Sequence, residues 1–122
     1  MVPDQSDARR LALALPGATE GAHCGKADFR AGGKIFASLP GDGVVVLKFL
    51  AEQQATRIAA WPGAFAAVPG GWGQKGWTRL HLAAVDLGLL EDALAAAWRN
   101  VAPKRLQRDL AATSAPAHSP RS

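Results

Sequence analysis

The sequence predicts a two-layer α+β domain in which helices cover one face of a mainly antiparallel sheet. Two observations support this fold class. Stretches of alternating apolar and polar residues are joined by short glycine-rich turns, which is typical of antiparallel hairpins. The alternation also indicates strands buried on one face only, so the other face of the sheet should stay partly open. The expected order is α-β-β-β-α-β-β-α.

The first helix is expected over Ser6–Leu15, because its apolar residues recur at helical spacing at Ala8, Leu11, Ala12 and Leu15. Asp4 or Ser6 can cap its N-terminus, and Pro16-Gly17 should end it.

Three strands should follow, over Ala27–Ala31, Lys34–Leu39 and Val44–Leu50. Gly32-Gly33 predicts a tight hairpin between the first two, because both positions of such a turn favour positive φ. In the first strand Phe29 should point inward and Asp28 and Arg30 outward. If Ile35, Ala37 and Leu39 point inward in the second strand, Phe36 faces outward.

The second half of the sequence predicts a helix over Glu52–Trp61, with Ala55, Ile58 and Ala59 facing inward. No capping residue precedes this helix. A short strand over Phe65–Val68 and a longer one over Trp77–Ala84 come next. The last helix should span Leu87–Val101, since Asp86 is a good N-cap and an apolar stripe runs from Leu90 to Val101.

The length of 122 residues fits one domain, expected over residues 1–106, with a disordered Ala/Ser/Pro-rich tail over 107–122. A single cysteine, Cys24, cannot form an internal disulfide and favours a reducing compartment. The chain shows neither a signal peptide nor an apolar stretch long enough to span a bilayer. We therefore expect a cytoplasmic protein without a membrane partner.

The glycine-rich run Pro69–Leu82 contains Gly71-Trp72-Gly73-Gln74-Lys75-Gly76, which formally matches the dinucleotide-binding pattern G-x-G-x-x-G. That pattern requires a strand before it and a helix after it, whereas here a strand follows. Lys75 precedes glycine rather than Ser or Thr, so the run is not a Walker loop either. We predict a loop that leads into the strand, and no cofactor.

Catalytic and metal-binding patterns are weak in this sequence. His23 and Cys24 are adjacent and should point to opposite sides of an extended segment, and His81 and His118 lack ligand spacing. Asp28 is expected to form a salt bridge, to Arg79 or to neighbours of Arg30, rather than to act as a general base. We expect neither a metal site nor an enzyme.

The strongest functional candidate is the outer face of the sheet. Strand alternation places Arg30, Lys48, Trp77, Arg79 and His81 there, with Lys75 just before them. Basic groups interleaved with aromatic rings suit phosphates and stacked bases. They suit an acidic protein partner equally well, or form a solvated face without a direct role.

The net charge of +4 adds little to this choice, because most of the excess lies after Ala102, where Lys104, Arg105, Arg108 and Arg121 outnumber Asp109. Lys34, Lys104 and Arg105 are further candidates for contact with nucleic acid.

Three stretches, Leu15–Leu39, Val68–Asp86 and Leu90–Leu106, together resemble the MmcQ/YjbR family of small bacterial proteins. The resemblance implies the α-β-β-β-α-β-β-α architecture, a shape related to secretion chaperones, and DNA binding without defined catalytic residues. The alternative is a module that binds a protein or a small ligand, as a monomer or a dimer. The candidate nucleic-acid-binding residues are Arg30, Lys34, Lys48, Lys75, Trp77, Arg79, His81, Lys104 and Arg105.

Overall fold

The computed structural model describes residues 2–23, 25–41 and 43–109. Six strands form one antiparallel sheet in the order β1-β2-β3-β4-β6-β5, which confirms the predicted α+β class. The elements in chain order are α1 (Gln5–Leu13), β1 (Thr19–His23), β2 (Lys26–Ala31), β3 (Lys34–Gly41), β4 (Val44–Lys48), α2 (Ala51–Ala60), β5 (Phe65–Ala67), α3 (Gly71–Gln74), β6 (Trp77–His81), a 3₁₀ turn (Leu82–Ala84) and α4 (Leu87–Val101).

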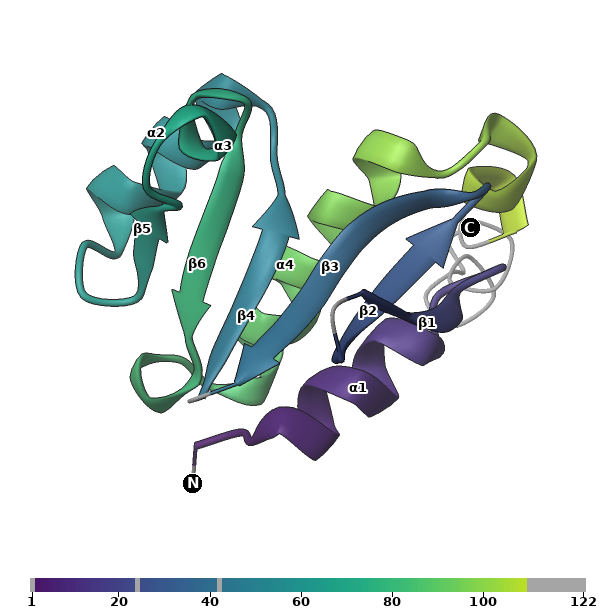
Figure 1. The fold of residues 1–122 in the computed structure, drawn as a ribbon, viewed down its shortest axis with the longest axis horizontal. Coiled ribbons are helices and arrows are strands. Elements are labelled where there is room, and N and C mark those ends of the chain that lie inside the picture. The colour runs from purple at the N-terminus through teal and green to yellow at the C-terminus, as the bar shows by residue number, and fades with distance from the viewer. Residues whose placement is uncertain (1, 24, 42, 110–122) are drawn as a thin grey trace, which may run out of the picture.

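The longer helices α1, α2 and α4 pack on one face of the sheet, with α4 behind β3 and β4 in Figure 1 and α1 against α4. The core lies between these layers and is built on large side chains without solvent contact, among them Phe29, Phe36, Leu94 and Trp98. The Trp98 indole Nε1 donates a hydrogen bond to the Pro16 carbonyl at 3.0 Å, which ties α4 to the end of the first helical segment. The opposite face of the sheet carries no long helix among the described residues.

The number of strands and the register of β3 differ from the sequence prediction. Strand β1 was not expected, because Thr19–His23 is short and has a glycine at its centre, yet all five of its residues pair with β2. A register shift between β2 and β3 sets Ala37 opposite Phe29 and Ile35 opposite Arg30, so that Phe36 is an extra residue in β3. The expectation of an outward Phe36 is therefore wrong: Phe36 is buried in the core, and Ile35 shares the open face.

Helix α2 also differs from its predicted face, since none of its residues is buried and Ala55 and Ala59 are exposed. Arg57 anchors it instead. The Arg57 guanidinium lies 5.4 Å from the Phe49 ring and 5.7 Å from the Phe65 ring, and it forms an ion pair with Asp92 of α4 at 2.8 Å. Ile58 packs against the core as predicted, but the charged guanidinium of Arg57 is a contact that apolar periodicity does not detect.

The final strand is shorter than predicted. β6 ends at His81, and Leu82–Ala84 form a 3₁₀ turn rather than extending the strand to Ala84. Helix α4 has the predicted bounds and cap, with the Leu89 amide donating to Asp86 at 2.8 Å. Residues 104–109, part of which the sequence assigns to the tail, are helical. The rest of the predicted tail, 110–122, lies outside the described residues.

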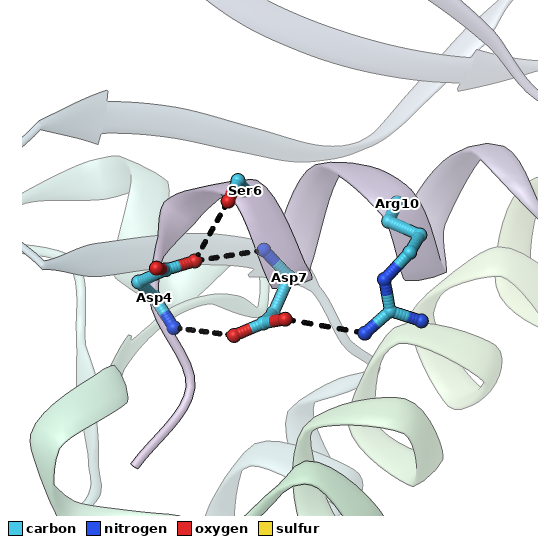
Figure 2. A network of polar contacts seen from close by, with 4 residues as sticks. All are labelled: Asp4, Ser6, Asp7 and Arg10. Atoms are coloured by element: carbon cyan, nitrogen blue, oxygen red, sulfur yellow. Dashed lines mark hydrogen bonds and ion pairs between the residues drawn. The ribbon is translucent and has the colours of Figure 1, made fainter.

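Asp4 caps α1 through a reciprocal network with Asp7 (Figure 2). Asp4 Oδ1 accepts from the Asp7 amide at 3.0 Å and from the Ser6 hydroxyl at 2.9 Å, while Asp7 Oδ2 accepts from the Asp4 amide at 3.0 Å. Asp7 Oδ1 also forms an ion pair with Arg10 Nη2 at 3.2 Å. The hydrogen bond from the Asp7 amide, followed by that from Ser6, lowers the pKa of Asp4 below its ordinary value of 3.8.

This network predicts a pH-dependent contribution to stability. Because folding depresses the pKa of Asp4, its charged form stabilises the fold above pH 3.8 and loses that effect as pH falls through the lower folded pKa. Asp4→Asn keeps an acceptor for the cap but removes the charge. The thermal unfolding midpoint of the wild type minus that of Asp4→Asn should stay constant around neutral pH. In acid this difference should fall. A difference that is the same at every pH would contradict this role.

Candidate functional site

The strand register aligns one row of residues across the open face of the sheet. From β1 to β5 the paired residues are Gly21, Asp28, Ser38, Val46, Arg79 and Ala66. Directly paired residues share a face, so all six face away from the helix layer. A neighbouring row contains Lys48 and its partner Trp77. These two rows bring charged, apolar and aromatic side chains from separate strands onto one surface.

A groove with a volume of about 410 Å³ lies on this open face. Its apolar lining comes from Ile35 of β3, Val46 of β4 and Val68 just after β5. Trp72 and Trp77 provide an aromatic wall, and Lys26, Asp28 and Ser38 add polar groups. The groove is within the usual size range of small-molecule sites, roughly 300–1,000 Å³, which are apolar with a few polar groups.

Two tryptophans and two lysines form a contact cluster beside the groove, here called the Trp–Lys cluster: Lys48, Trp72, Lys75 and Trp77. The two indole rings meet edge to face, with centroids 6.2 Å apart and an angle of 72°. Lys48 Nζ lies 5.4 Å from the centre of the Trp77 ring, and Lys75 Nζ lies 5.7 Å from that of Trp72. Lys48 Nζ also donates to the Lys75 carbonyl at 2.6 Å. Cations therefore lie over both aromatic rings.

The one-turn helix α3, which carries Trp72, is held tightly against its neighbours. A Cβ at Gly73 would lie 2.0 Å from the Val68 carbonyl oxygen, and one at Gly76 would lie 1.9 Å from that of Phe49. Gln54 of α2 donates to the Gly73 carbonyl at 3.0 Å. Close backbone approach thus explains Gly73 and Gly76, two of the three glycines of the apparent nucleotide motif, while a Cβ at Gly71 would meet no atom within 4 Å. The turn is a fixed support, and Trp72 extends from it with 62% of its surface exposed.

Asp28 and Arg30 form a salt bridge on the open face, with Arg30 Nε 2.9 Å from Oδ1 and Nη2 3.2 Å from Oδ2. The Asp28 side chain is 2% exposed and that of Arg30 39%. The hydrogen bonds from Asp28, together with its charge, raise the pKa of Arg30. The predicted salt bridge thus exists, but its partner is Arg30 itself, two positions along the same strand, and not Arg79 or a residue on another strand.

The structure divides the predicted site residues into two groups. Arg30, Lys48, Trp77, Arg79 and His81 lie at open-face positions, and Lys75 lies beside Trp72 in the Trp–Lys cluster.

The other group contains Lys34, Lys104 and Arg105. Lys34 pairs with Ala31, which is buried under the helix layer, so it does not share the open face. Lys104 and Arg105 follow Pro103, which packs against Gly32 in the turn between β2 and β3. In Figure 1 this segment and α3 lie at opposite ends of the molecule.

Sequence reasoning did not select Trp72 or Lys26 as site residues. Trp72 lies in the run that the sequence predicts only as a loop leading into the strand, although a tryptophan within a glycine-rich turn that precedes a basic strand is a signal for a presented ring. Lys26 shares the alternation of Asp28 and Arg30, but it precedes the first predicted strand, Ala27–Ala31. Both residues line the groove.

The charge on the open face is mainly positive. Asp28 is the only acidic residue among the described strand positions on this face, and it is paired with Arg30. Within the described ranges, Lys26, Lys48, Lys75 and Arg79 form no ion pair with a carboxylate. Lys26 lines the groove, and the other three cations lie on the same face or in the Trp–Lys cluster, which favours an anionic ligand.

Other parts of the described structure are less suited to a specific ligand. Two further hollows, of about 550 and 460 Å³, lie beside the start of α1, and their described lining contains no aromatic ring. Residues 2–23, 25–41 and 43–109 contain no group of three His, Cys, Asp or Glu side chains placed to hold a metal. In the same ranges, every helix is too short or too polar to cross a membrane.

Comparison with known proteins places the fold and the family. The solved structure of Deinococcus radiodurans protein DR2400, which contains a DUF419 domain, is similar with a TM-score of 0.66 and 20% sequence identity. The match covers 80% of this chain and 77% of that one. A search of curated proteins gives no match. The family model YjbR matches residues 13–100, and the chain therefore belongs to the YjbR family.

Proposed function

We propose that the protein binds DNA through the open face of its sheet, without catalysing a reaction. The observation that carries the proposal is Trp72, a largely exposed ring on a fixed turn, flanked by Lys75 and Trp77 at the edge of an apolar groove on a face rich in cations. Aromatic rings that stack on bases, combined with cations that neutralise phosphates, are the two elements of nucleic-acid binding that does not depend on sequence.

The rigidity of α3 supports this reading of Trp72. An exposed tryptophan on a loose loop would have to be ordered when a ligand binds, at a cost in conformational entropy. Here Gly73, Gly76 and Gln54 already fix the turn in the free protein. The ring is thus preorganised for contact. A cytoplasmic location, where DNA is accessible, is part of the proposal.

Trp72→Ala tests the proposal directly. Because stacking on an aromatic ring contributes about 1–3 kcal/mol per base, the variant should bind a labelled single-stranded oligonucleotide about tenfold more weakly at about 50 mM salt. Fluorescence anisotropy gives the affinity. Leu87→Ala is the matched control, since Leu87 is an exposed apolar residue on α4, in the opposite layer. The proposal fails if the wild type binds neither single-stranded nor duplex DNA, or if the two variants weaken binding equally.

A second candidate is a module that binds a small ligand or a protein segment in the same groove. The apolar lining by Ile35, Val46 and Val68 favours it, since these side chains offer no contact to a phosphate. A partner that remains bound after nuclease treatment, together with no affinity for oligonucleotides, would replace the first proposal with this one.

A further inference from the structure

The groove has a shape and lining that suit one component of a nucleic acid, the unpaired base. This step rests on the proposed function and deepens it. In a duplex the faces of the bases are stacked on one another, and only their edges and the backbone are accessible. An aromatic wall is useful to a nucleic-acid ligand only where bases are unstacked and can leave the strand. The exposed ring of Trp72 and the apolar groove beside it present such a wall.

We infer that the protein prefers single-stranded DNA, with one unpaired base inserted into the groove between the Trp–Lys cluster and the apolar residues Ile35, Val46 and Val68. The volume of about 410 Å³ falls within the range that accommodates a small flat ligand. The edge-to-face rings present one indole face and one indole edge, so a base that stacks on one ring meets the other at its rim.

The lysines of the cluster differ in how they are held. Lys48 Nζ contacts the Trp77 ring and also donates to the Lys75 carbonyl, so it has a fixed place beside the groove. The Lys75 ammonium lies over the Trp72 ring at 5.7 Å. Lys75 does not line the groove, so a base inserted there leaves the ammonium beside Trp72. In that place the ammonium binds a phosphate that flanks the inserted base.

The rest of the open face agrees with a single strand better than with a duplex. Reading the major groove requires a projecting helix or a two-stranded ribbon. The described helices of eight or more residues, α1, α2 and α4, lie in the other layer. What the open face presents instead is a groove with cations around it, Lys26 on one side and Lys48 and Lys75 on the other.

The test compares three labelled ligands with the wild-type protein: a single strand of about 12 nucleotides, its duplex, and a strand of the same length without bases. The single strand should bind about tenfold more tightly than either of the other two at about 50 mM salt. Trp72→Phe should retain this preference, whereas Trp72→Ala should remove it, because phenylalanine still offers a ring for stacking.

Each outcome decides a different point. If the duplex binds as tightly as the single strand, base insertion is wrong and DNA binding stands. If the abasic strand binds as tightly as the normal one, the face recognises only the backbone, and the role of the groove is overturned. If none of the three ligands binds, the proposed function fails as well, and base insertion fails with it.

Discussion

Replacing Gly76 with alanine should destabilise the fold by about 4 kcal/mol or more, a large part of the 5–15 kcal/mol typical of a domain. The new Cβ would lie 1.9 Å from the Phe49 carbonyl oxygen, which is backbone and cannot move aside by a rotamer change. Gly76 also has φ of 100°, where side chains are strained. Relief of the overlap requires the chain around Phe49 and Gly76 to separate. Urea denaturation measures the loss.

Gly70→Ala is the matched control for this experiment. Gly70 lies at the start of the same turn with φ of 79°, but a Cβ there would meet no atom within 4 Å. The control therefore contains the backbone strain of a positive φ without the overlap, and it should cost about 1–3 kcal/mol. Equal stability of the two variants would show that close backbone approach at Gly76 does not hold the turn.

The second large effect is expected on binding. The double variant Lys75→Glu with Arg79→Glu removes two cations from the open face and adds two negative charges. Each phosphate contact on a single strand contributes about 0.7 to the slope of log affinity against log salt. At about 50 mM salt, one contact therefore contributes about eightfold in affinity relative to about 1 M salt. Loss of two contacts, with added repulsion, should weaken binding about a hundredfold. Anisotropy with a labelled single strand measures this change.

Lys104→Glu with Arg105→Glu is the matched control, because it reverses the same number of charges at the opposite end of the molecule. Long-range attraction is screened beyond about 10 Å at about 0.1 M salt, so this variant should lose only a few-fold in affinity. A loss of affinity as large as that of the open-face variant would show that the binding site lies in the region that follows α4.

Much of the fold was predictable because its signals are local. The spacing of apolar residues and the cap at Asp86 gave α4 its bounds, and Gly32-Gly33 predicted the turn between β2 and β3. The errors arose where tertiary contacts decide. The extra residue Phe36 reverses the alternation within β3, and nothing in the local pattern reveals such a bulge. Strand β1 depends on pairing with β2 rather than on its own composition.

In the candidate site, too, local signals were predictive and tertiary contacts were not. Alternation placed Lys48, Trp77 and Arg79 on one face, since each lies in a regular strand. The role of the glycines could not be deduced from the sequence. It depends on the close approach of Gly73 to the Val68 carbonyl and of Gly76 to the Phe49 carbonyl, which only the folded chain creates. The glycine-rich turn around Trp72 is a sequence signal for a presented ring, but the exposure of that ring depends on how α3 is held.

The salt dependence of single-strand binding tests the central claim most directly, because its slope reports the number of phosphates that the protein contacts. The slope of log affinity against log salt should become shallower by about 1.4 in Lys75→Glu with Arg79→Glu, and it should stay unchanged in Lys104→Glu with Arg105→Glu. That pair of results would place the phosphates on the open face of the sheet. An unchanged slope in the first variant would contradict the account.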